Sequence, residues 1–240
     1  MAPGTPDHLT PRKRPRQARA IVTLDAIFEA TIQVLVAEGI QRLTTTRVAH
    51  RAGVSVGTMY QYFPHKQALI YALNERYLDV LAAKVEATCQ AQKGASLDRM
   101  VEALIDTYWR AKTERPEITR ALYRSVAEID NEAMIAAFSA RVDAATTGMF
   151  NGACDATFTD LKTVNLTLVT VIFGTVRNAF ERNLGQKETV GLYRQLILLC
   201  RSYLDAVVRT EGRFQSGDGD PACPLPGGGF LGLPDPAETS

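Results

Sequence analysis

Residues 44–66, which read TTTRVAHRAGVSVGTMYQYFPHK, constrain the fold of this chain more than any other segment. They predict two short helices joined by a sharp turn and followed at once by a third helix. Thr44 is placed to cap the first helix, because its hydroxyl can accept an amide N–H that a helix N-terminus leaves unpaired. Gly53 ends that helix, since glycine tolerates a positive φ. The pattern is typical of a helix-turn-helix, and it favours a DNA-binding protein.

The second motif helix is predicted to have two different faces, and Ser55 is expected to cap it. Met59 and Phe63 lie four residues apart, so they share a face and should point into the core. On the other face, Gly57 removes side-chain bulk where the backbone would approach a phosphate. Short polar residues at a helix start suit a helix whose N-terminal end enters the major groove.

By its residues, the stretch from Ile27 to Leu69 resembles the tetracycline-repressor-like (TetR) family of transcriptional regulators. The resemblance covers about a sixth of the chain. It implies an all-α protein, in which an N-terminal three-helix helix-turn-helix DNA-binding domain precedes a larger helical ligand-binding and dimerisation domain. The matching residues are Ala37-Glu38-Gly39, Thr44-Thr45, Val48-Ala49, Ala52-Gly53-Val54-Ser55, Gly57-Thr58, Tyr60, Tyr62-Phe63 and Lys66-Gln67-Ala68-Leu69.

The same resemblance implies which positions contact DNA. Thr45, Thr46 and Arg47 would face the DNA from the first motif helix. The residues that would approach the bases or the sugar edge are Val56, Gly57, Thr58 and Gln61. Tyr60, Tyr62 and Lys66 would hold phosphates. His65 could bind a phosphate or be an idle surface histidine. Because Val56 and Gly57 carry no side-chain donor, base readout would depend on Arg47, Thr46 and apolar contacts with thymine methyl groups. The DNA-binding set is Thr45, Thr46, Arg47, Ser55, Val56, Gly57, Thr58, Tyr60, Gln61, Tyr62, His65 and Lys66.

Charge and composition divide the chain into four expected parts. Residues 1–66 contain nine Lys/Arg against four Asp/Glu, whereas the whole chain has a net charge of +1. This basic excess suits phosphate neutralisation, although a solvated basic surface would look the same. We expect a flexible basic arm over residues 1–18, which either enters a minor groove or is a solubilising tail. The helix-turn-helix domain covers 19–66, an effector-binding and dimerisation domain covers 67–212, and a disordered Gly/Pro-rich tail covers 213–240.

Apolar periodicity predicts further helices on both sides of the motif. Their expected ranges are about 19–38, 64–92, 97–113, 116–129, 131–150, 160–183 and 188–210. The last two are apolar over so much of their circumference that they need partners on more than one side. Two such helices from each subunit would form a four-helix dimer interface, as the resemblance also implies; burial within one subunit is the alternative.

The resemblance implies a small-molecule pocket among the helices after about Ala83, with the helix that starts at Pro64 connecting this pocket to the DNA-binding domain. Aromatic walls could come from Tyr108, Trp109, Tyr123, Phe138 and Phe173, and these residues could equally be ordinary core. Polar determinants could come from Thr107, Glu128, Arg141, Thr170 or Arg177. The family default is a repressor that binds a palindromic, double-stranded operator as a homodimer and is released by a small-molecule effector. An activator, or an interaction module of the same fold without specific DNA binding, is the alternative.

Other classes of protein lack support in the sequence. Carboxylate pairs such as Glu102 with Asp106 could be proposed as an acid and a base, but they lie in no recognisable catalytic motif. We therefore expect no catalytic residues and no enzyme. The four cysteines form no CxxC cluster and residues 67–240 contain no histidine, so we expect no metal site and no cofactor. The N-terminus lacks the apolar core of a signal peptide, and no stretch is predicted to span a membrane, which favours a cytoplasmic protein.

Overall fold

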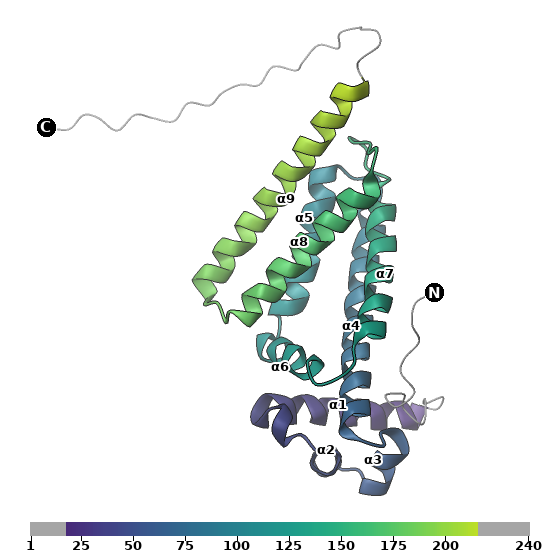
Figure 1. The fold of residues 1–240 in the computed structure, drawn as a ribbon. Helices are drawn as coiled ribbons and strands as arrows, with labels where there is room; N and C mark the ends of the chain where they lie inside the picture. The colour runs from purple at the N-terminus through teal and green to yellow at the C-terminus, as the bar shows by residue number, and fades with distance from the viewer. Residues whose placement is uncertain (1–17, 216–240) are drawn as a thin grey trace, which may run out of the picture.

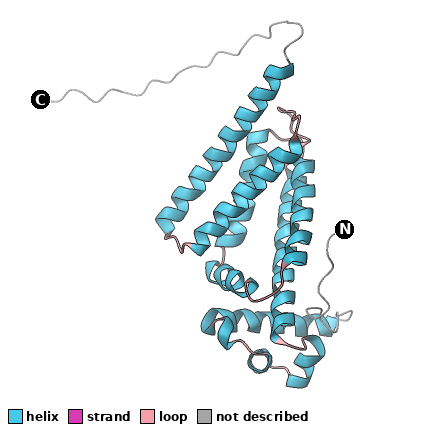
Figure 2. Ribbon diagram, viewed as in Figure 1, coloured by secondary structure: helices cyan, strands magenta, loops and turns pink. Residues whose placement is uncertain are grey.

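The computed structural model describes residues 18–215, and every regular element in that range is a helix (Figures 1 and 2). The all-α prediction is therefore confirmed. The DNA-binding motif lies at one end of the molecule and a longer helical bundle extends from it (Figure 1). The elements are α1 (Ala18–Glu38), the short 3-10 helix η2 (Ile40–Arg42), α2 (Thr45–Ala52), α3 (Val56–Tyr62), α4 (Lys66–Ala91), α5 (Leu97–Thr113), α6 (Pro116–Val126), α7 (Glu132–Phe150), α8 (Leu161–Glu181) and α9 (Gln186–Gln215).

Three helix ends differ from the sequence prediction. Helix α4 begins at Lys66 rather than at Pro64, because the His65 Nδ1 atom caps it by accepting the Ala68 N–H at 3.2 Å. Helix α6 ends at Val126, three residues early. Helix α9 continues to Gln215, so it includes the first residues of the range predicted to be a tail. The rest of that tail and nearly all of the predicted basic arm lie outside the described residues.

Two hydrophobic cores divide the molecule. The N-terminal core joins α1, α2 and α3 to the first two turns of α4, through buried residues such as Ile27, Val48, Met59 and Phe63. The larger core lies among α4, α5, α7, α8 and α9 and contains Leu104, among others. Since α4 contributes to both cores, the DNA-binding motif is attached to the bundle by a continuous helix.

Helix α6 also contacts both parts of the molecule. Its Ile118 and Leu122 side chains are buried in the N-terminal core. Its Tyr123 ring instead meets Phe180 of α8 edge to face, with the ring centroids 6.2 Å apart. A movement of α6 where it contacts α8 would therefore also change its packing against the N-terminal core.

Helices α1 and α8 are apolar enough to cross a membrane by length and composition alone. Within these apolar stretches, 33% of α1 and 39% of α8 are buried. In α1, Ile27 and Val34 are buried in the N-terminal core, and in α8, Leu168 and Ile172 are buried in the larger core. Each helix therefore contributes one face to a core.

Candidate DNA-binding surface and effector cavity

The helix-turn-helix is fixed by local hydrogen bonds at the predicted positions. The Thr44 hydroxyl accepts the Arg47 N–H at 3.2 Å and so caps α2. Gly53 ends α2 in the left-handed region, with a φ of 66°. The Ser55 hydroxyl accepts the Thr58 N–H at 2.9 Å and caps α3. These bonds pair amides that a helix start leaves free, and they set the angle between the two helices.

The two faces of α3 are divided as the sequence predicts. Met59 and Phe63 are fully buried. The residues of the opposite face are exposed and accessible to a partner. They are Ser55, Val56, Gly57, Tyr60 and Gln61. Thr46 and Arg47 of α2 are exposed beside them. Figure 1 shows this motif at the tip of the molecule, away from the bundle.

Several predicted DNA contacts have other roles in the free protein. Tyr62 is only 5% exposed and packs in the N-terminal core, and Thr45 is also buried. The Arg47 guanidinium forms an ion pair with Glu38 of α1. The Thr58 hydroxyl hydrogen-bonds that of Ser55 at 2.9 Å. Fewer of the predicted residues therefore present a side chain that is both exposed and free of other contacts.

His65 and Lys66 lie at the start of α4, next to the motif. Both are half-buried, and the His65 ring is engaged as the helix cap. The Lys66 ammonium is a point charge at a helix N-terminus that already favours anions. This position suits a contact with a backbone phosphate.

Inside the bundle, the Lys112 side chain of α5 is surrounded by aromatic rings. Its side chain is only 2% exposed. The Nζ atom lies 4.6 Å from the ring centroid of Tyr77 on α4, 4.9 Å from that of Tyr123 on α6 and 5.6 Å from that of Tyr108 on α5. Among residues 18–215, no carboxylate forms an ion pair with it. We call Lys112 with these three tyrosines the tyrosine cage.

The tyrosine cage shifts the ionisation of its members. Burial, and then the positive charge of Arg177 on α8, together lower the pKa of Lys112 to about 7. Burial also raises the pKa of Tyr77, raises that of Tyr108 well above its usual range and raises that of Tyr123 to about 12. The three phenols therefore stay neutral near neutral pH, and Lys112 is the group that titrates there.

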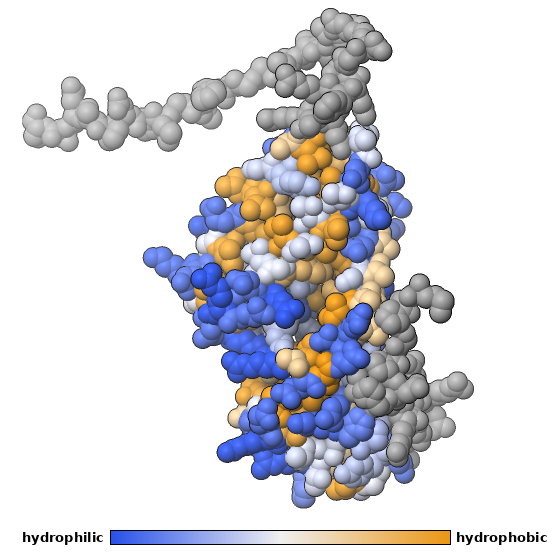
Figure 3. All heavy atoms as spheres, viewed as in Figure 1, coloured by the Kyte–Doolittle hydropathy of each residue, from blue (hydrophilic) through white to orange (hydrophobic). Residues whose placement is uncertain are grey.

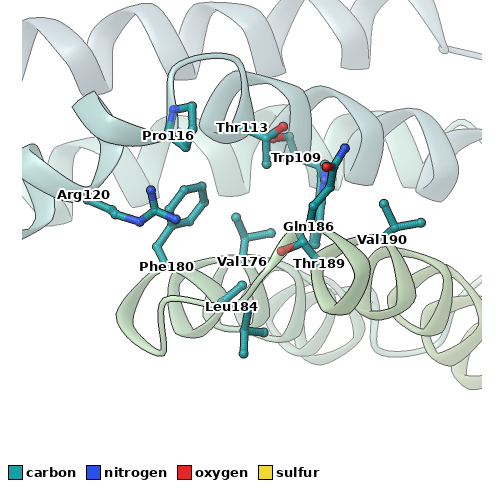
Figure 4. A pocket seen from close by; sticks show the side chains of 11 residues that line it. Trp109, Thr113, Pro116, Arg120, Val176, Phe180, Leu184, Gln186, Thr189 and Val190 are labelled. Carbon is teal, nitrogen blue, oxygen red and sulfur yellow. The ribbon is translucent and has the colours of Figure 1, made fainter.

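A cavity of about 440 Å³ is lined by residues of α5, α6, α8, the loop after α8 and the start of α9 (Figure 4), and its Phe180 ring contacts Tyr123 of the cage. This volume is typical of a small-molecule site. Figure 4 shows the guanidinium of Arg120 beside the Phe180 ring at one end of the cavity, and the Arg120 Cζ atom is 5.7 Å from that ring's centroid. The lining residues are Trp109, Thr113, Pro116, Arg120, Val176, Ala179, Phe180, Leu184, Gln186, Thr189 and Val190.

Of the five aromatic residues predicted to line a ligand pocket, Trp109 lines this cavity. Tyr123 does not line the cavity, but its ring contacts Phe180, which does. Tyr108 and Phe173 stack at 3.8 Å, and Phe138 lies 5.8 Å from Phe173, so these three form an aromatic cluster in the larger core.

The sequence prediction missed Lys112 and Arg120. A signal for Lys112 existed, because it follows Leu104 and Tyr108 at four-residue intervals and so continues the buried stripe of α5. Arg120 had no comparable signal. Its neighbours Phe180 and Trp109 come from other helices.

Comparison with protein families matches both parts of the chain. The family described as "Bacterial regulatory proteins, tetR family" matches residues 27–73. The family described as "Tetracyclin repressor-like, C-terminal domain" matches residues 96–204. The two matches cover the N-terminal core and the bundle that holds the cavity.

Two curated relatives match part of this chain. The nucleoid occlusion factor SlmA of Haemophilus ducreyi is 35% identical over 97 residues, which are 40% of this chain and 47% of SlmA. The transcriptional repressor KstR of Mycobacterium tuberculosis is 30% identical over 107 residues, 45% of this chain and 48% of KstR. The chain thus spans about half the length of the curated relatives it matches.

The fold is shared with solved structures at low sequence identity. A TetR transcription regulator from Haloarcula marismortui superposes with a TM-score of 0.63 at 22% identity, over 78% of this chain and 98% of the other. This likeness extends through the helical bundle as well as the DNA-binding motif.

Proposed function

Because the chain belongs to the TetR family of bacterial regulatory proteins, we propose that it is a ligand-responsive repressor that binds a palindromic operator as a homodimer and is released by a small-molecule effector. The observation that carries this proposal is that one molecule presents two candidate binding surfaces. One is the exposed face of α3, and the other is the cavity lined by Trp109 and Phe180.

The exposed face of α3 supports sequence-specific DNA binding. Its residues are short or glycine at the helix start, with Tyr60 and Gln61 one turn later. Such a helix can enter the major groove while buried Met59 and Phe63 hold it to the domain. We propose that Tyr60 and Lys66 contact phosphates, and that Gln61 and Arg47, once released from Glu38, reach base edges.

The outer faces of α8 and α9 support the homodimer. Leu166 on α8 and Leu198 and Leu199 on α9 are 58%, 57% and 53% exposed. Gly174 on α8 is exposed, and no atom lies within 4 Å of the Cβ it lacks, so another helix could approach there. Figure 3 shows apolar residues gathered over this part of the molecule. A symmetric pair of subunits joined there would present two α3 helices to one palindrome.

The contacts of α4 and α6 support coupling between the cavity and the DNA. Arg120 of α6 lines the cavity, while Ile118 and Leu122 of the same helix pack in the N-terminal core. An effector that favours a different position of α6 would shift the population toward a geometry that does not fit the operator. By linkage, operator DNA would then weaken effector binding by the same factor.

A regulator that binds the chromosome acts in the cytoplasm of a bacterium, and we propose that location. The alternative role is an interaction module of the same fold that has no specific DNA site.

The direct test is a mobility-shift titration of the full chain with the intergenic DNA upstream of its own gene, in the presence of scrambled competitor and at several salt concentrations. We expect specific binding by a dimer and an affinity that falls steeply with salt. If neither this DNA nor a genome-wide selection of bound fragments gives a specific site, the interaction module is the correct reading.

A matched pair of lysine variants controls this test. Lys66 is the first residue of α4, next to the motif, and Lys93 lies just past the other end of the same helix. Lys66→Ala should weaken binding to all sequences alike and reduce the slope of log K against log salt by about one. Lys93→Ala removes the same charge and should leave both quantities unchanged. Equal effects of the two variants would mean that only net charge matters.

A further inference from the structure

In the described part of the chain, no carboxylate pairs with the buried Lys112 ammonium. It is almost fully buried, and the three tyrosine faces around it supply only the partial compensation of cation–π contacts. Two carboxylates whose charges act on the cage tyrosines Tyr77 and Tyr123 pair with other cations. Glu181 pairs with Arg177 at 2.7 Å and Glu114 pairs with Lys84 at 3.6 Å. A buried charge in this state destabilises a fold, so its presence suggests a functional reason.

Two further buried donors near Lys112 lack an acceptor. Among the described residues, the Arg120 Nε atom and the Tyr123 hydroxyl have no hydrogen-bond partner. The hydroxyls of Tyr108 and Tyr123 lie close enough to influence each other's pKa, but not in hydrogen-bonding geometry. Unsatisfied buried donors are rare in native proteins. Here both donors belong to α6 and flank the same region as the unpaired lysine.

The positive charge in this region comes from three helices. Lys112 lies on α5, Arg120 on α6 and Arg177 on α8, with the Arg177 Cζ atom 5.8 Å from the Tyr123 ring centroid. The cavity that Arg120 lines is otherwise mainly apolar, with Trp109, Val176, Phe180 and Leu184 in its walls. The Phe180 ring lines the cavity and contacts both Arg120 and Tyr123 of the cage. The site therefore combines an apolar chamber with a cationic end.

The geometry points to an amphipathic acid as the effector: an apolar body fills the cavity, and its carboxylate passes Phe180 to pair with Lys112 and Arg120. This inference rests on the proposed role of the bundle as an effector-binding domain and names the chemical class that it takes. The carboxylate would supply the missing counterion of Lys112 and accept the free Arg120 Nε–H and Tyr123 O–H bonds. Charge-assisted bonds of this kind are stronger than neutral ones.

The acid would also reach the helix that holds the DNA-binding domain. Arg120 and Tyr123 are on α6, as are Ile118 and Leu122 of the N-terminal core. Drawing two α6 donors toward a carboxylate would move this helix relative to α5. The site of charge recognition and the coupling element are thus the same helix.

Three probes with one decyl chain and different head groups test the assignment: decanoate, decanamide and decylamine. Trp109 is the only tryptophan of the chain and lines the cavity, so its fluorescence reports binding in the full-length protein without DNA. At pH 7 we expect decanoate to bind at least about tenfold more tightly than the other two probes, because only its charge complements the cage. In Lys112→Met this advantage should fall below about threefold.

Two further measurements separate the charge effect from misfolding. Arg110→Met removes an exposed cation from the same helix and should leave the preference for decanoate unchanged. In the wild-type protein, decanoate affinity should decrease as the pH rises from 6 to 9, because Lys112 loses its proton while the three tyrosines and Arg177 that face it do not change charge. The Lys112→Met protein should show no such decrease.

Each contrary outcome overturns the assignment. These are equal binding of the three probes, tighter binding of decylamine, no fluorescence change with any probe, or a decanoate preference that survives in Lys112→Met. If Lys112→Met does not fold, a wild-type affinity that is flat between pH 6 and 9 overturns it as well. Because all titrations omit DNA, a failure of operator binding would overturn the proposed repressor function and leave this result standing.

Discussion

Replacing Lys112 by methionine should change how the stability of the protein depends on pH. In the folded protein, burial and then the charge of Arg177 lower the pKa of Lys112 from its usual 10.5 to about 7. The unfolded chain therefore keeps a proton on this amine between pH 7 and 10.5 that the folded chain has released. Where the unfolded state binds more protons, stability rises with pH, and below pH 7 the cost of burying the cation is present in full.

The magnitude follows from these two pKa values. Proton linkage gives a contribution that makes the wild-type protein about 3 kcal/mol more stable at pH 9 than at pH 6. Methionine has a similar stem and no charge, so Lys112→Met lacks this contribution. The stability advantage of the variant over the wild type should therefore be largest at pH 6 and shrink by about 3 kcal/mol by pH 9.

Urea unfolding at pH 6, 7.5 and 9, followed by circular dichroism at a fixed protomer concentration, measures this difference. The concentration is fixed because the proposed dimerisation would add to the apparent stability. Comparing variant with wild type cancels the titration of groups that both proteins share. A difference between the two proteins that stays constant within about 1 kcal/mol across the three pH values would refute the reasoning, because Lys112 would then titrate alike in the folded and unfolded states.

Three further substitutions test other parts of the molecule. Gly57→Ala places a Cβ whose nearest atom is the Ser55 Oγ at 3.7 Å, so thermal stability should not fall and should rise slightly, because alanine favours a helix more than glycine does. DNA affinity in a mobility shift should fall about tenfold if DNA approaches the α3 backbone there, and an unchanged affinity would mean that it does not. Leu199→Asp on α9 should convert a dimer into monomers in analytical ultracentrifugation, whereas Val80→Asp, equally exposed on α4, should not; a dimer that survives Leu199→Asp would move the interface elsewhere. Leu122→Ala should lower the free energy of unfolding by about 2–4 kcal/mol in urea titrations, and a loss below about 1 kcal/mol would mean that α6 is not firmly packed in the N-terminal core.

The helix-turn-helix could be predicted because its determinants are local. Thr44, Gly53 and Ser55 act within three or four residues of their own positions, so the order of residues along the chain contains the whole signal. The inward face of α3 followed in the same way from the spacing of Met59 and Phe63. Helix ends were less accurate where a side chain replaced the expected signal, as His65 does at the start of α4.

The charged interior could not be predicted in the same way. Lys112 is buried because rings from α4, α5 and α6 meet around it, and this meeting depends on how the helices pack. Periodicity marks the position as inward-facing, but a lysine there would ordinarily indicate a solvated face. Likewise, the ion pair between Arg47 and Glu38 depends on the angle between α1 and α2.

The length of α4 has a geometric consequence for regulation. Its 26 residues span about 39 Å at 1.5 Å per residue. Tyr77 of the tyrosine cage lies near its midpoint, and the DNA-binding motif precedes its first turn. A tilt of about 5° over this length displaces one end by about 3 Å, close to the rise of one base pair along a DNA helix. In the proposed repressor, an angular change too small to disturb the packing of the bundle would become a register error at the operator, and in the proposed homodimer the errors of the two subunits would add.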